Sequence, residues 1–441
     1  MAPSRENVLD IAKTIGFDIP EHEVDDYTIL LQKMAKTLEK VADMDDYQPK
    51  PDLETNPRRN IYFPKPEDNP LAAWAWRFEA TSRNPSSSLL QNKTICLKDN
   101  ICVVDVPCLL GTDTFTDWTP KMDATVVTRI LSAGGTITGK AVCENLSRGA
   151  VSVTAATGPV HNPYARGYSV GGSSSGTAAL VASGAVDMGI GCDQGGSIRI
   201  PASFAGLYGF KPTFGLVPYT GIVSNDASLD YVGPMTTTCL DTAILLESIA
   251  GVDGLDDRQI AGTPFPSSVP SYSQILLSSP QPLGLHGLKI GVLTEGLPHE
   301  IIDLNVLEKF NQAISIFRKL GAVVEEVSVP MHAEARTIYS VVSKMGNHMG
   351  MMGKATGRRQ VGLTDLLEKK GLPYTSKVIN KQIRQPQPAP NKPIQRGLAN
   401  ASDPPSPDDP PPGLPIPCSR FFSSGPIDQL DGRVVGKHLS V

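Results

Sequence analysis

Two clusters of glycine and serine contain the side chains of this chain that could do nucleophilic chemistry. The first cluster, Gly171–Gly176, reads GGSSSG, and the second, Cys192–Arg199, reads CDQGGSIR. Glycine lets the backbone come close to a bound group, and serine supplies a hydroxyl that attacks a carbonyl carbon once a base takes its proton. We therefore expect a hydrolytic site that contains no histidine and that depends on a lysine far upstream.

The second cluster is the more informative of the two. A Gly195-Gly196-Ser197 turn that opens a helix would present successive backbone N–H groups at the positive end of that helix. Such donors suit a developing oxyanion, and Ser197 sits where it could attack the substrate. A tight turn, or an anion-binding turn without chemistry, would leave the same pattern.

A serine nucleophile needs a base, and the sequence offers two candidates. His161 is the only histidine nearby in sequence, whereas Lys98 ends an apolar stretch, Ile95–Leu97. A lysine with its ordinary pKa of about 10.4 is a poor base at neutral pH, but burial lowers that pKa. The alternative for Lys98 is an ordinary strand-end lysine that is exposed to solvent.

Two glycine-rich segments have the spacing of nucleotide-binding motifs but fail on order or composition. Gly134–Lys140 has phosphate-loop spacing, yet Ala141 stands where a magnesium-binding hydroxyl is needed, and the segment enters a strand instead of following one. Gly189-x-Gly191 fails as a dinucleotide fingerprint because Gln194 occupies the position of the third glycine. Neither segment therefore predicts a nucleotide site.

A third motif, Gly172–Gly176, matches the nucleophile elbow of α/β-hydrolases with Ser174 at its centre. That fold would need a strand before the motif and an aspartate and a histidine after it. The preceding segment, Arg166–Ser169, is a poor strand, and the downstream histidines stand in no recognisable context. An esterase with Ser174 as nucleophile is nevertheless an alternative that labelling can test.

Alternating strand and helix patterns from Leu71 to about residue 330 predict an α/β fold with crossover helices. The segment 1–50 is expected to form amphipathic helices, and 51–70 is expected to be a linker. The expected strands are 93–100, 136–138, 186–191, a buried strand 288–293, and 322–327. The expected helices are 174–182, one that Ser197 begins and Pro201 breaks, and three that Asp123, Asp241 and Asp303 cap.

Composition narrows the class of protein. The 441 residues are 40% hydrophobic and 19% charged, with a formal net charge of −5, which argues against nucleic-acid or anionic-membrane partners. No apolar run reaches the roughly 20 residues of a membrane-spanning helix, and the N-terminus has no signal-peptide pattern, so a cytoplasmic protein is expected. The seven cysteines are scattered, which favours buried reduced thiols, and the histidines form no metal-ligand cluster.

Taken together, these residues resemble the amidase signature family over about Asn69 to Gln259. The segment Asp253–Gln259 (DGLDDRQ) resembles the nitrile-pathway type of amidase in particular. The resemblance rests on Leu97–Asn100 (LKDN), Asp123–Val127 (DATVV), Gly139–Glu144 (GKAVCE), and the glycine-serine stretch through Gly209–Thr213 (GFKPT).

The resemblance implies a role for three residues. It makes Lys98 the neutral general base and Ser173 the relay that passes the proton. It makes Ser197 the nucleophile that becomes an acyl ester, so that an amide is hydrolysed to a carboxylic acid and ammonia. It implies a small-molecule amide substrate and no metal or organic cofactor. It leaves the oligomeric state open, with a homodimer as one option because family members often form one.

The resemblance also assigns the residues around the nucleophile. The backbone N–H groups of Gln194, Gly195, Gly196 and Ser197 would form the oxyanion hole. Asp193 and Arg199 would hold the turn by pairing, with Ser174 in a supporting place. The implied fold is a mixed central β-sheet covered by helices on both faces, over residues 71–377.

The last part of the chain departs from the family pattern. Family members continue with further helices, a strand and part of the pocket wall, whereas 378–441 is rich in proline and is expected to be disordered. The first alternative function is therefore a catalytically impaired, truncated amidase or pseudoenzyme. A less favoured alternative is an amidotransferase subunit.

Overall fold

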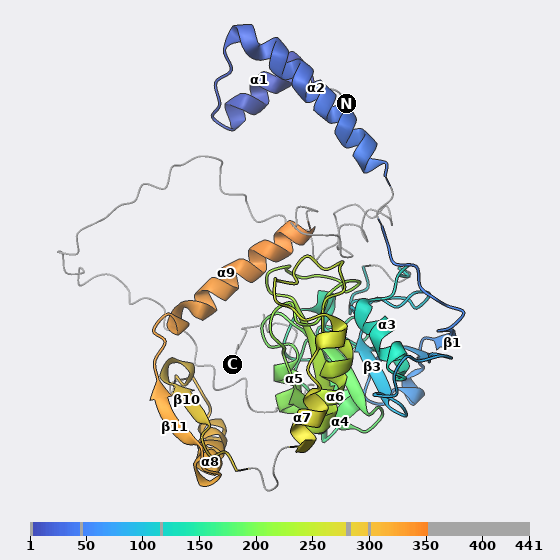
Figure 1. The fold of residues 1–441 in the computed structure, drawn as a ribbon, viewed down its shortest axis with the longest axis vertical. Coiled ribbons are helices and arrows are strands. Elements are labelled where there is room, and N and C mark those ends of the chain that lie inside the picture. Colours follow the sequence, from blue (N-terminus) through green and yellow to red (C-terminus); the bar gives the residue numbers. More distant parts are fainter. Residues whose placement is uncertain (1–2, 45–46, 115–117, 279–283, 299–300, 352–441) are drawn as a thin grey trace, which may run out of the picture. The chain divides into compact units, whose positions relative to one another are not determined.

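The computed structural model describes residues 3–44, 47–114, 118–278, 284–298 and 301–351 (Figure 1). The chain divides into two compact units, Met1–Lys50 and Pro51–Val441. The expected proline-rich tail, 378–441, lies outside the described residues.

The first unit is a pair of helices, as the sequence predicted for this segment. A capping box begins the first helix, because the Ser4 hydroxyl accepts from the Asn7 N–H while the Asn7 carboxamide accepts from the Ser4 N–H. Val8 and Ala12 on this helix are buried together with Val24. The elements are α1 (Arg5–Thr14), a 3₁₀ turn (Glu21–Glu23) and α2 (Val24–Ala42).

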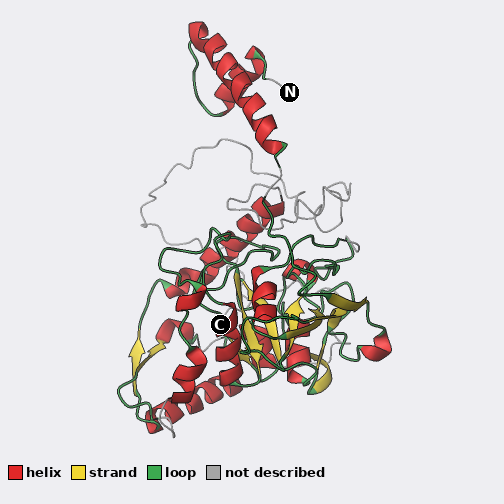
Figure 2. Cartoon of the chain, turned by 45° about the vertical axis from the view of Figure 1, so that its right-hand side comes forward, coloured by secondary structure: helices red, strands yellow, loops and turns green. Residues whose placement is uncertain are grey.

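The second unit is built on a seven-stranded sheet with the order β1-β2-β4-β3-β7-β9-β8. Strand β3 runs parallel to β4 and β7, and the remaining neighbours are antiparallel, so the sheet is mixed. The predicted α/β class with a mixed central sheet is confirmed (Figure 2). The strands are β1 (Arg58–Tyr62), β2 (Trp74–Ala80), β3 (Thr94–Lys98), β4 (Thr136–Ala141), β7 (Met188–Asp193), β8 (Tyr208–Gly209) and β9 (Tyr231–Thr236).

Helices pack on both faces of this sheet, and the alternation of β3 shows how. Ile95 and Leu97 enter one hydrophobic core with residues of α3 and α6, whereas Cys96 enters a second core with residues of α4 and α5. Because side chains alternate along a strand, Lys98 lies on the same face as Cys96, toward α4. The helices are α3 (Thr125–Ser132), α4 (Ser175–Ala182), α5 (Arg199–Phe204), α6 (Cys239–Ile249) and α7 (Tyr272–Ser278).

Smaller elements complete the second unit. A short antiparallel pair consists of β5 (His161–Asn162) and β6 (Ala165–Ser169), and a parallel pair consists of β10 (Lys289–Leu293) and β11 (Val323–Val327). Helix α8 (Leu304–Lys319) connects β10 to β11, and α9 (His332–Met351) follows β11. Short 3₁₀ turns occupy Pro66–Asp68, Asn145–Ser147, Pro266–Ser268 and Thr294–Gly296.

The expectation that Asp123 caps a helix is wrong. Helix α3 begins at Thr125 with Ala124 as its N-cap residue. The Asp123 carboxylate instead pairs with Arg58 and accepts from the Val104 N–H at 2.9 Å. The carboxylate next to the helix start therefore pairs with a cation 65 residues away, and a local sequence pattern cannot reveal such a partner.

Asp241 is likewise not an N-cap. The Thr238 hydroxyl caps α6 by accepting from the Asp241 N–H at 3.0 Å, and the Asp241 carboxylate pairs with Lys93 at 2.8 Å. The cap predicted at Asp303 is confirmed, since its carboxylate accepts from the Asn305 N–H at 2.9 Å at the start of α8.

Three further expectations differ from the structure. The segment 51–70 contains an unpredicted edge strand, β1, that pairs with β2. Pro201 does not break the helix after Ser197 but lies inside α5, in its first turn, where a missing N–H costs no helical hydrogen bond. Strand β10 is not buried, because it belongs to a two-stranded sheet in which Lys289 and Gly291 are exposed.

Candidate active site

Lys98 ends β3 with its side chain completely buried. Its Nζ atom lies 2.7 Å from the Ser173 hydroxyl and 3.2 Å from the Cys192 carbonyl oxygen. Burial lowers the pKa of Lys98, because desolvation disfavours the charged amine. No carboxylate lies within ion-pair distance of Lys98 in the described part of the chain. This lysine is therefore placed to act as a neutral amine.

A second buried lysine nearby shows the contrast. Lys140 on β4 is also completely buried, but its Nζ lies 3.1 Å from the equally buried Asp99 carboxylate. Burial alone would lower the pKa of Lys140, but the Asp99 charge outweighs it and raises that pKa above its ordinary value. Of the two lysines, only Lys98 is therefore set up to give and take a proton.

Ser173 connects Lys98 to the loop that precedes the first cluster. The Ser173 side chain is buried, and its hydroxyl donates to the Ser147 carbonyl oxygen at 2.8 Å. Its own carbonyl oxygen accepts from the Glu144 N–H at 3.2 Å, and the Gly172–Ser173 peptide bond is cis. The Ser173 hydroxyl thus lies between the buried Lys98 amine and a fixed acceptor.

The turn that carries Ser197 is organised by one buried carboxylate. Asp193 accepts from the backbone N–H groups of Gly196 at 2.6 Å and Ile198 at 3.1 Å. It also accepts from Arg199 Nε and Nη2, both at 3.0 Å. Burial alone would raise the pKa of Asp193, but the Arg199 contacts hold it below its ordinary value. A charged Asp193 therefore fixes the shape of the turn.

Ser197 itself is half-buried, unlike the fully buried Ser173. Its carbonyl oxygen accepts from the Ser174 N–H at 3.2 Å, which joins the two glycine-serine clusters. The Gly196 N–H donates to Asp193, while the N–H groups of Gly195 and Ser197 have no acceptor within the described residues. Those two donors are therefore available to an oxyanion.

Neither alternative nucleophile nor alternative base finds support in the geometry. Ser174 is completely buried, and its hydroxyl lies 3.3 Å from the Cys192 carbonyl oxygen and 3.4 Å from the Cys192 N–H. His161 lies on β5, and no hydrogen bond joins it to either serine cluster over the residues that the structure describes. An elbow serine would be exposed and hydrogen-bonded to a histidine.

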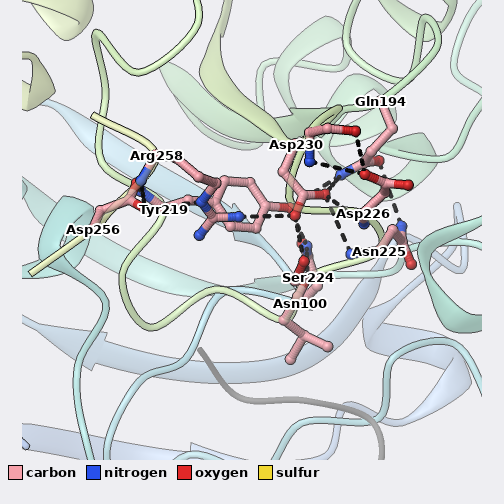
Figure 3. A network of polar contacts seen from close by, with 11 residues as sticks. Asn100, Gln194, Tyr219, Ser224, Asn225, Asp226, Asp230, Asp256 and Arg258 are labelled. Atoms are coloured by element: carbon pink, nitrogen blue, oxygen red, sulfur yellow. Dashed lines mark hydrogen bonds and ion pairs between the residues drawn. The ribbon is translucent and has the colours of Figure 1, made fainter. Parts of the chain in front are cut away.

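A buried polar network that the sequence did not predict supports Gln194 (Figure 3). The Gln194 carboxamide donates to Asp230 at 2.8 Å and to the Tyr219 hydroxyl at 3.1 Å. Arg258 binds the other oxygen of Asp230 at 2.9 Å and Asp256 at 2.8 Å. The only sequence signal was the segment Asp253–Gln259, to which no role was given; Asp230 and Tyr219 gave none.

Helix α9 contributes a second set of unpredicted contacts, from one of its faces. A Cβ atom added to Gly195 would lie 2.1 Å from the Tyr339 hydroxyl, so Tyr339 packs directly on the turn. One turn later on α9, the Ser343 carbonyl oxygen accepts from Arg148 at 3.2 Å. Gly346 packs on the carboxylate of Asp226. Because residues i, i+4 and i+7 share a helix face, this face of α9 forms a wall of the site.

The described residues were compared with the requirements of metal sites and membrane-spanning helices. Within the described ranges, no group of three or more His, Cys, Asp or Glu side chains could hold a metal ion. No helix drawn from those same ranges combines the length and apolar character that crossing a bilayer requires. The five cysteines from Cys96 to Cys192 are buried and unpaired, whereas Cys239 is exposed.

Comparison with known proteins finds similarity to amidases and to an amidotransferase subunit. The family model described as Amidase matches residues 22–388. An enantioselective amidase from Rhodococcus rhodochrous is 40% identical over 313 residues, which are 70% of this chain and 58% of that protein. A glutamyl-tRNA(Gln) amidotransferase subunit from Gloeobacter violaceus is 37% identical over 262 residues, 59% of this chain and 51% of the relative.

Solved structures agree with these relatives. The peptide amidase from Stenotrophomonas maltophilia superposes with a TM-score of 0.54 at 29% identity, covering 68% of this chain and 63% of that one. The corresponding glutamyl-tRNA(Gln) amidotransferase subunit from Thermotoga maritima gives a TM-score of 0.52 at 30% identity, covering 66% and 60%. The chain thus spans less than two thirds of the length of each relative described here.

Proposed function

The chain belongs to the amidase family, and from that premise we propose that it hydrolyses a carboxamide through Lys98, Ser173 and Ser197. The products are a carboxylic acid and ammonia. The observation that carries the proposal is the buried Lys98 amine, 2.7 Å from the Ser173 hydroxyl and without a carboxylate partner in the described residues. A buried, uncompensated amine favours its neutral form, which a general base requires.

Acylation uses these groups in sequence. Lys98 accepts the Ser173 proton while Ser173 accepts the Ser197 proton, and the Ser197 oxygen bonds to the amide carbon. The N–H groups of Gly195 and Ser197 stabilise the oxyanion of the tetrahedral intermediate. The intermediate collapses as the C–N bond breaks, and the proton held by Lys98 returns through Ser173 to the nitrogen, so that ammonia leaves.

Deacylation runs through the same groups with water in place of serine. Water gives a proton by way of Ser173 to Lys98 and attacks the ester carbon. The ester bond breaks, Ser197 recovers a proton, and the carboxylic acid is released. No step needs a metal or an organic cofactor.

Ammonia release from a panel of simple aliphatic and aryl-alkyl amides tests this proposal. We expect release by the wild type and a loss of at least about 1,000-fold in Ser197→Ala and Lys98→Met. Ser174→Ala is the matched comparison, because it removes a neighbouring serine hydroxyl that supports the site but transfers no proton, so its loss of activity should be far smaller. A folded wild type that releases no ammonia from any amide would refute the proposal and favour the catalytically impaired or pseudoenzyme alternative.

A serine-reactive fluorophosphonate tests the nucleophile separately. Peptide mass mapping should place the label on Ser197 and not on Ser174. Label on Ser174 would instead support an esterase of the α/β-hydrolase type.

A second candidate is an amidotransferase subunit, because several relatives carry that name at 33–38% identity. Ammonia release from free glutamine alone, with no hydrolysis of other amides, would favour it.

We extend the main proposal to a cytoplasmic homodimer. Light scattering after size-exclusion chromatography tests the oligomeric state.

A further inference from the structure

Arg148 differs from the other arginines near the site in what it binds. Arg199 and Arg258 each bind a buried carboxylate, and Arg58 pairs with Asp123. Arg129 donates to four backbone carbonyl oxygens between 2.7 and 2.9 Å. Each of these four cations is therefore compensated by a carboxylate or by several carbonyl oxygens.

Arg148 has one such acceptor in the part of the chain that the structure describes, the Ser343 carbonyl oxygen at 3.2 Å. Its Nε atom is completely buried and has no hydrogen-bond partner there. A guanidinium has five N–H donors, and a buried donor without an acceptor is costly, so such a group calls for an explanation. Burial lowers the pKa of Arg148, which agrees with a cation that its surroundings compensate poorly.

Asp226 and Asp230 offset part of the effect of burial on the pKa of Arg148, but they do not pair with it. Asp226 accepts from the Ser228 N–H at 2.8 Å and from the Ser228 hydroxyl at 2.6 Å. Asp230 binds Arg258 and Gln194 through its two oxygens. Neither lies within ion-pair distance of Arg148, so neither neutralises it directly.

Arg148 also lies at the site itself. Its neighbour Ser147 provides the carbonyl oxygen that the Ser173 hydroxyl contacts. Its guanidinium reaches Ser343, which is one turn of α9 from Tyr339, and Tyr339 packs on Gly195 of the nucleophile turn. The guanidinium and the nucleophile turn thus contact the same face of α9, at residues one helical turn apart.

We propose that Arg148 determines substrate specificity by binding a carboxylate on the acyl group, so that the preferred substrates are half-amides of dicarboxylic acids. This inference rests on the proposed amide hydrolysis. The free donors of a planar guanidinium match the two oxygens of a carboxylate in a bidentate pair. Succinamate and glutaramate are the short half-amides that serve as probes.

Binding is measured first, in the Ser197→Ala protein, which does not turn over substrate. Calorimetry compares succinamate with 4-methylpentanamide and glutaramate with 5-methylhexanamide, since each pair differs only in replacing a carboxylate by an isopropyl group. We expect the better half-amide to bind about 10- to 100-fold more tightly than its neutral partner. Equal affinities, or no binding of either half-amide, would overturn the inference.

Arg148→Met in the same background should abolish that difference, and Arg148→Lys should restore part of it. Arg166→Met is the matched control, because it removes an exposed arginine of the same unit. If Arg148→Met weakens charged and neutral amides equally, Arg148 only holds α9 in place and the inference is wrong. Thermal midpoints for all variants show whether each is folded.

Turnover by the protein with Ser197 intact separates the two proposals. Hydrolysis of neutral amides with no preference for half-amides would overturn the inference and leave the proposed function standing. Half-amides that bind through Arg148 but are not hydrolysed would refute the proposed hydrolysis and leave only a carboxylate-binding role for Arg148.

Discussion

Asp193→Asn should loosen the nucleophile turn, because Asp193 makes four hydrogen bonds from a completely buried side chain. Asparagine keeps one acceptor oxygen but turns an NH₂ group toward donors that the second oxygen had satisfied. Removing one partner of a buried ion pair costs about 3–5 kcal/mol. Arg199 is 39% exposed, so solvent screening reduces this to about 2–3 kcal/mol in the free energy of unfolding.

Activity should fall more than stability. The Gly196 and Ile198 N–H groups that Asp193 holds flank Ser197, so a looser turn misplaces both the nucleophile and the oxyanion donors. We expect kcat to fall about 100-fold, the scale of losing one oxyanion-hole donor. Urea unfolding gives the stability change, and ammonia release gives kcat.

Arg199→Met is the matched comparison. It leaves Asp193 with both backbone donors but without the cation that offsets its burial, so it should cost about as much stability as Asp193→Asn but less than about tenfold in kcat. The double variant should be less than additive, because both changes remove the same contact. If Arg199→Met lowers kcat as much as Asp193→Asn does, the backbone contacts of Asp193 do not organise the turn and the reasoning is refuted.

The other predictions follow from single contacts. Lys98→Met should raise the free energy of unfolding at pH 7 by about 1 kcal/mol, since it removes a buried amine, and urea unfolding that shows a loss instead would contradict this. Because the pKa of Lys98 is lowered in the folded protein, the free energy of unfolding should rise with pH from that lowered pKa toward about 10.4. For the same reason kcat/KM should rise with pH as the amine loses its proton. A pH–rate profile without an ascending limb would exclude a lysine base. Gly195→Ala should lower kcat/KM by displacing Tyr339, and Tyr339→Ala should restore part of it; no restoration would show that the loss has another origin. Asp123→Asn should cost about 3 kcal/mol by leaving Arg58 buried and unpaired, and a change below about 1 kcal/mol in urea unfolding would show that this pair is dispensable.

Local sequence patterns predicted the elements that carry the catalytic candidates. The alternation around Lys98 predicted β3, and the small residues after Ser174 predicted α4, because both signals lie within one element. Strands β1, β2 and β9 were not predicted. Trp74–Ala80 mixes buried and half-exposed positions without clean alternation, and Tyr231–Thr236 contains a proline.

The parts of the site that sequence did not predict depend on contacts between distant segments. Arg148 and Ser343 are 195 residues apart, and Gln194 and Asp230 are 36 apart. Their residue types are unremarkable in their own segments, and only the fold brings them together. The mistaken cap at Asp123 has the same origin, because Arg58 reaches it from another strand.

The register between β3 and β4 separates two buried lysines whose pKa values are shifted in opposite directions. Leu97 pairs with Lys140 and Lys98 pairs with Ala141, so the two lysine side chains leave the sheet on opposite faces. The irregular step between Ile95 and Cys96 sets that offset. The sheet therefore keeps the two amines in separate electrostatic environments, one on each of its faces. The pKa of Lys140 is raised on one face, and the pKa of Lys98 is lowered on the other.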